Sequence, residues 1–108
     1  MPDRTTEGDQ TLIPPSFHAV HADARGRLRL SRDEFRARYE LCEDLAQALV
    51  EQAQAIRHDL GVTEADVLVR IDAGLRSPDA GLAEGEAAWV MRRLAELLDW
   101  PWPRRPGD

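Results

Sequence analysis

The strongest constraint on the fold is one apolar stripe between residues 31 and 60. Its members are separated alternately by four and three residues: Phe35, Tyr39, Cys42, Ala46, Leu49, Ala53, Ile56 and Leu60. This spacing places them all on one face of a helix. Leu41, Leu45 and Val50 widen the stripe, which predicts contact with more than one neighbouring element. We therefore expect a long helix, at about 32–60, to be the central element of an all-α domain.

Both ends of this helix carry recognisable signals. Ser31 is followed three residues later by Glu34, as in a capping box, and Leu30 is placed to contact Phe35 across the first turn. Gly61 stands where a left-handed residue commonly ends a helix. We expect loss of the Ser31 hydroxyl to cost about 1 kcal/mol.

Two shorter helices are predicted after it. The first, at about 64–75, begins with Thr63 as its cap and buries Val67, Leu68, Ile71 and Leu75. The second, at about 84–99, has a weaker start because Ala83 lacks a cap oxygen and Gly85 lies in the first turn; Pro101 stops it. Its predicted core residues are Ala87, Val90, Met91, Leu94, Leu97 and Leu98.

The remaining segments have less regular patterns. Residues 1–16 contain several prolines among polar residues and are expected to form a disordered arm, with only Leu12 and Ile13 as apolar anchors. Residues 17–30 fit a short hairpin, a helical turn or irregular chain. The Pro-rich residues 101–108 are expected to be an extended tail. The predicted fold is thus a three-helix domain over residues 17–100.

The long helix should extend beyond the shorter helices that pack on it. Twenty-nine residues span about 43 Å at 1.5 Å per residue, whereas the helix at 64–75 spans about 18 Å. The exposed overhang must be covered by residues 17–30, by the tail or by another chain. This mismatch is the main physical argument for a homodimer.

A second stripe on the helix at 84–99 is not explained by its core face. Trp89, Arg93, Glu96 and Trp100 are separated by four, three and four residues, so they share a face roughly opposite Leu94. Trp and Arg are the residue types that dominate protein interfaces. We expect this stripe either to bind a partner or to be covered within the monomer by the segment 12–17 or by the tail.

Charge is unevenly distributed along the chain, whose net charge is -6. Six arginines (Arg25, Arg27, Arg29, Arg32, Arg36 and Arg38) gather at the start of the long helix, whereas acidic residues predominate from 40 to 66. One interpretation is an antiparallel homodimer in which the basic end of each long helix faces the other's acidic half. Other interpretations are a nucleic-acid or anion patch, through Arg27, Arg29 and Arg36, and an ordinary solvated surface. The acidic net charge argues against nucleic acid.

No motif predicts catalysis, a metal site or a cofactor. Residues 21–32 resemble a calcium loop around Gly26, but His21, Arg25 and Arg32 stand where oxygen ligands are needed. The single cysteine, Cys42, lies on the apolar stripe and excludes an internal disulfide. We therefore expect a small cytoplasmic interaction or regulatory module that acts through another protein or itself, without catalysis or a membrane span. The alternatives are the nucleic-acid regulator and a small enzyme or ligand binder around Cys42.

Overall fold

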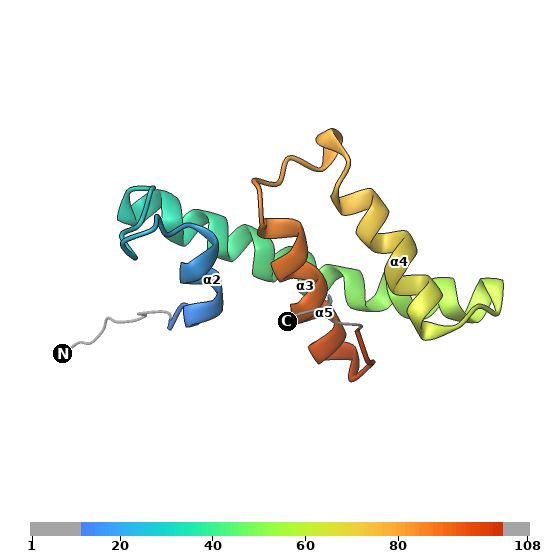
Figure 1. Ribbon diagram of the computed structural model, residues 1–108. Coiled ribbons are helices and arrows are strands. Elements are labelled where there is room, and N and C mark those ends of the chain that lie inside the picture. The colour runs from blue at the N-terminus through green and yellow to red at the C-terminus, as the bar shows by residue number, and fades with distance from the viewer. Residues whose placement is uncertain (1–11, 103–108) are drawn as a thin grey trace. The chain divides into compact units, whose positions relative to one another are not determined.

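The computed structural model describes residues 12–102, which form four α-helices and a short 3-10 helix (Figure 1). In chain order the elements are α2 (Pro15–Val20), α3 (Arg32–Leu60), α4 (Glu64–Leu75), η1 (Pro78–Ala80) and α5 (Glu86–Leu98). The all-α prediction is confirmed, and within these residues the only β pairing is one isolated bridge. Residues 1–11 of the predicted arm and 103–108 of the predicted tail lie outside the described part.

The predicted ends of α3 and α4 agree with the structure. Ser31 and Glu34 form both halves of the capping box, because each backbone N–H donates to the other's side-chain oxygen at 3.1 Å. Thr63 Oγ1 accepts from the N–H of Asp66 at 3.0 Å. Gly61 follows α3 with a φ of 66°, in the left-handed region that ends helices.

Helix α5 begins at Glu86, two residues later than predicted. Gly85 has a φ of 88°, which is incompatible with a right-handed helix. The side chain of Glu86 accepts a hydrogen bond from the N–H of Ala83 at 2.7 Å. The N–H of Glu86 in turn donates to Ala83 O at 3.0 Å, so these two bonds hold the turn that precedes the helix.

The chain divides into two compact units, Met1–Tyr39 (unit 1) and Glu40–Asp108 (unit 2). The described core of unit 1 is an aromatic cluster around Phe17, which is fully buried. Its ring centroid lies 5.5 Å from those of Phe35 and Tyr39 and 5.4 Å from that of His21. Residues 15 and 16, predicted as the end of the arm, begin helix α2 instead, since Pro15 is well suited to a first helical position. Helix α2 thus covers the start of α3.

The loop after α2 is held by one aspartate. The Asp23 carboxylate accepts from the N–H groups of Arg25 at 2.8 Å and Arg27 at 3.0 Å. A bridge between Ala22 and Leu28 closes the loop. Of the alternatives for residues 17–30, the structure therefore combines a helical turn with a loop that is closed like a hairpin but has no extended strands.

The core of unit 2 is built by α4, α5 and the part of α3 from residue 40 onward. Most of its buried residues come from the predicted faces: Cys42, Ala46, Leu49, Ala53, Val67, Leu68, Ile71, Leu75, Ala87, Val90, Met91 and Leu94. Glu86, Trp89 and Ala95 are buried as well, although they lie outside the predicted face of α5. Leu97 and Leu98 are only half-buried, and Leu60, at the end of the stripe, is exposed. In unit 2, then, the predicted core is confirmed except near the ends of α3 and α5.

Candidate functional site

The second stripe of α5 does not form one exposed face. Trp89 is only 8% exposed, whereas Arg93 and Trp100 are half-buried. Trp89 thus belongs to the interior, whereas a residue that binds a partner has to be exposed. Arg93 contacts Glu43 of α3, so α3 covers this part of the stripe, whereas the predicted covers were the segment 12–17 and the tail.

Arg93 joins α5 to α3 through a two-pronged ion pair with Glu43. Its Nε and Nη2 donate to the two carboxylate oxygens at 2.8 and 3.0 Å. The pKa of Glu43 is lowered, chiefly by this hydrogen bonding, against the opposing effect of burial; Gln47 also donates to the carboxylate at 2.8 Å. The same pairing raises the pKa of Arg93. Both groups are therefore charged at neutral pH, and their role is to fix the two helices.

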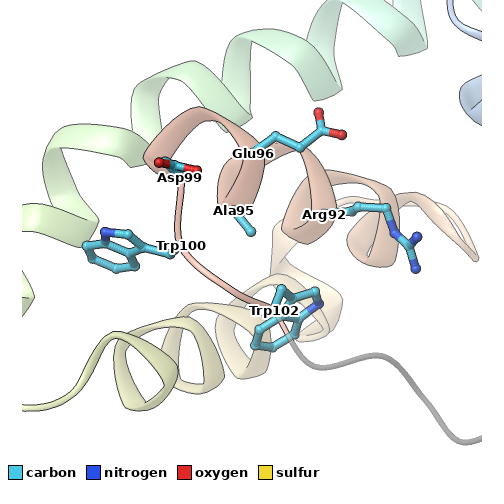
Figure 2. A pocket seen from close by; sticks show the side chains of 6 residues that line it. All are labelled: Arg92, Ala95, Glu96, Asp99, Trp100 and Trp102. Atoms are coloured by element: carbon cyan, nitrogen blue, oxygen red, sulfur yellow. The ribbon is translucent and has the colours of Figure 1, made fainter.

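The end of α5 and the chain after it line an open hollow of about 270 Å³ (Figure 2). We call it the Trp hollow; it is lined by Arg92, Ala95, Glu96, Asp99, Trp100 and Trp102. Arg57 of α3 lies 5.9 Å from the Trp100 ring centroid and has its own acidic neighbour, Glu64, at 3.9 Å. The hollow thus combines two indoles with two carboxylates, a set that suits a cationic group.

A second depression, the α3/α4 groove, is mostly apolar. It has a volume of about 240 Å³ and is lined by Leu49, Gln52, Ile56, Arg70, Ile71, Gly74 and Leu75. A Cβ at Gly74 would meet no atom within 4 Å, so the groove is open above this glycine. Leu41, at 45% exposure, and half-buried Leu45 do not line the groove, but their helical spacing from Leu49 places them on the same side of α3.

The basic residues named in the sequence all belong to unit 1. Arg27 and Arg29 lie on the loop before α3, and Arg36 lies in its second turn. Together with Arg25 and Arg32 they form the arginine patch. All five residues are exposed, and within residues 12–102 no ion pair holds any of their guanidinium groups.

Cys42 has no exposed surface. A nucleophilic thiol must be reached by its substrate, so this burial weighs against the enzyme alternative. His58 lies sixteen residues further along the same helix, about 24 Å away at 1.5 Å per residue. Among residues 12–102 no group of three His, Cys, Asp or Glu side chains is placed to hold a metal ion. In the same range no helix is long and apolar enough to cross a membrane.

Sequence reasoning missed three features of the structure. Glu86 is a fully buried carboxylate, signalled only by its place three residues after Ala83. The packing of Phe17 in its aromatic cluster could not be predicted, because the sequence shows only a single aromatic residue before an irregular segment. The cation–π contact between Arg57 and Trp100 joins residues that are 43 positions apart, and no local pattern predicts such a contact.

Comparison with protein-family models, with curated proteins and with solved structures finds no match for this chain.

Proposed function

We propose that this protein is a non-catalytic interaction module that associates with a second copy of itself. The observation that supports this most directly is the α3/α4 groove, where Leu49, Ile56, Ile71 and Leu75 line an open apolar depression. Leu41, two turns earlier on the same side of α3, adds an apolar residue that is 45% exposed. Apolar surface in a concave, open site is characteristic of protein interfaces.

Self-association also agrees with the length of α3. Helix α2 covers its first turns within unit 1, but Leu60 at its other end is 56% exposed. Burying such leucines between two chains would remove apolar area from water at about 25 cal/mol per Å². A dimer would therefore supply the cover that one copy lacks at this end.

The test is the solution mass over a concentration series, measured by sedimentation equilibrium. We expect the mass to rise from that of a monomer to twice 12.2 kDa. Gln52→Glu places a charge on an exposed groove residue and should weaken association. Gln54→Glu is the matched control, because Gln54 is exposed on the same helix but does not line the groove. A wild-type chain that stays monomeric throughout would refute the proposal.

The arginine patch supports a second candidate function, the binding of nucleic acid. Five exposed guanidinium groups, which form no ion pair with the described residues, could contact phosphates in a salt-dependent manner. The test is a mobility shift with single- and double-stranded DNA and RNA at low salt. Binding that weakens when Arg27, Arg29 and Arg36 are changed to Gln would support it, and no shift with any probe would exclude it.

A further inference from the structure

We propose that the Trp hollow of one copy receives an arginine side chain from the loop of residues 25–29 of a second copy. This inference rests on the proposed self-association and names a contact that would direct it. The hollow belongs to unit 2 and supplies aromatic rings and carboxylates. The loop belongs to unit 1 and supplies arginine side chains.

The Trp hollow is suited to a guanidinium group. Trp100 and Trp102 supply aromatic faces, and Asp99 supplies an exposed carboxylate with no ion pair among the described residues. Glu96 adds a second carboxylate; it accepts from Arg93 at 3.3 Å but is 63% exposed. Arg92 lies at the other end of the hollow from Trp100 (Figure 2).

The described part of the chain already contains a contact of this kind. Arg57 lies over the Trp100 ring, with the Glu64 carboxylate nearby. Arginine stacks on indole more favourably than lysine because its guanidinium is planar and weakly hydrated. Every basic residue in the chain other than histidine is an arginine.

The loop of residues 25–29 presents its arginines from a fixed backbone. The Asp23 carboxylate accepts from the N–H groups of Arg25 and Arg27, and the N–H of Arg29 donates to His21 O at 2.9 Å. These three side chains are exposed and have no ion pair in the described part of the chain. Because the loop backbone is already ordered, binding would cost little conformational entropy there.

Charge complementarity favours a second copy as the occupant. Residues 12–39 carry six arginines and three acids, a net charge of +3, whereas residues 40–102 carry five arginines and thirteen acids, a net charge of -8. Unlike units of two copies therefore attract, and like units repel. This pattern penalises an arrangement that places two acidic units together.

The experiment measures the dimer dissociation constant by sedimentation at low salt, using the full chain. We expect Trp102→Ala and, separately, Asp99→Asn to raise it by about tenfold, the scale of one desolvated cation–π contact or charged hydrogen bond. Asp44→Asn is the matched control, because Asp44 is exposed on unit 2 and does not line the hollow. Asp99→Asn tests the proposal even if Trp102→Ala disturbs the fold.

The arginine side is tested with two double variants of equal charge. Replacing Arg27 and Arg29 with Gln should weaken association by more than tenfold, whereas replacing Arg32 and Arg36 with Gln should weaken it much less. Equal losses in both pairs, or an equal loss in Asp44→Asn, would overturn the specific contact in favour of general charge attraction.

These outcomes are separable from failure of the proposed function. A wild-type protein that never dimerises refutes self-association itself. A dimer that is unaffected by Asp99→Asn and by the loss of Arg27 and Arg29 refutes only the arginine contact, and the groove variant Gln52→Glu then decides where the copies meet.

Discussion

Asp99 combines two features that lower the stability of a helix end: a left-handed backbone conformation and a negative charge. It is the only residue other than glycine in the described chain with a positive φ, 58°. Its N–H and that of Trp100 donate to Glu96 O and Ala95 O at 3.1 and 3.0 Å, which is the pattern of a helix ended by a left-handed residue. A carboxylate at this end also opposes the helix dipole. Both features should lower the stability of the fold, and the exposed Asp99 carboxylate is the group that the proposed arginine contact uses.

Replacing Asp99 with Gly should therefore stabilise the protein. Gly removes both the left-handed strain and the charge, and we expect a gain of about 1 kcal/mol in urea unfolding. Asp99→Ala is the informative comparison, because it removes the charge but still disfavours a positive φ. An equal gain for Ala and Gly would show that strain contributes nothing at this position.

The capping hydroxyl of Ser31 gives a second prediction at this scale. Ser31→Ala removes the acceptor for the N–H of Glu34, and we expect a loss of about 1 kcal/mol in urea unfolding. Ser31→Asp keeps an acceptor and adds a charge that the helix dipole favours, so it should retain most of the stability. Equal losses in the two variants would contradict a capping role.

At the scale of elements, the Glu43–Arg93 pair connects α3 with α5. The two side chains are 19% and 34% exposed, so solvent screens them in part. We expect a double-mutant cycle with Glu43→Gln and Arg93→Met to give a coupling energy of about 1 to 2 kcal/mol. A coupling near zero would mean that apolar packing alone holds α5 on α3.

The same pair predicts a pH dependence. The pKa of Glu43 is lowered in the folded protein from its ordinary value of 4.5. Its contribution to stability is therefore fully present above pH 4.5 and is lost as the pH falls through the lowered value. The stability difference between wild type and Glu43→Gln should shrink over that acidic range, as measured by urea unfolding. A difference that does not change with pH would contradict the assignment.

Helix positions and core faces could be predicted because they depend on local spacing and caps. Ser31, Thr63 and Gly61 each act through neighbours within four residues, and the helices they delimit were predicted accordingly. The hollow could not be predicted, because Trp100 meets Arg57 through tertiary packing. Likewise, the spacing of Trp89 and Arg93 identified their shared face but not whether α3 would cover it.

At the scale of the whole molecule, the described aromatic cluster belongs to unit 1 alone. Phe17 packs against Phe35, Tyr39 and His21, all of which precede residue 40. Phe17→Ala should raise amide hydrogen exchange in α2 and in the first turns of α3, because the cavity removes the main apolar contact there. Exchange in α5 should change little. Equal deprotection of α5 would show that the two units open together.

The buried position of Cys42 has a practical consequence. It is the only thiol in the chain and lies on α3 within unit 2, so a modifying reagent can reach it only after that core opens. If opening costs about 4 kcal/mol, alkylation should be slowed by about a thousandfold relative to the unfolded chain. The rate of thiol labelling thus reports how often unit 2 opens. Any variant or second copy that stabilises this unit should lower the labelling rate.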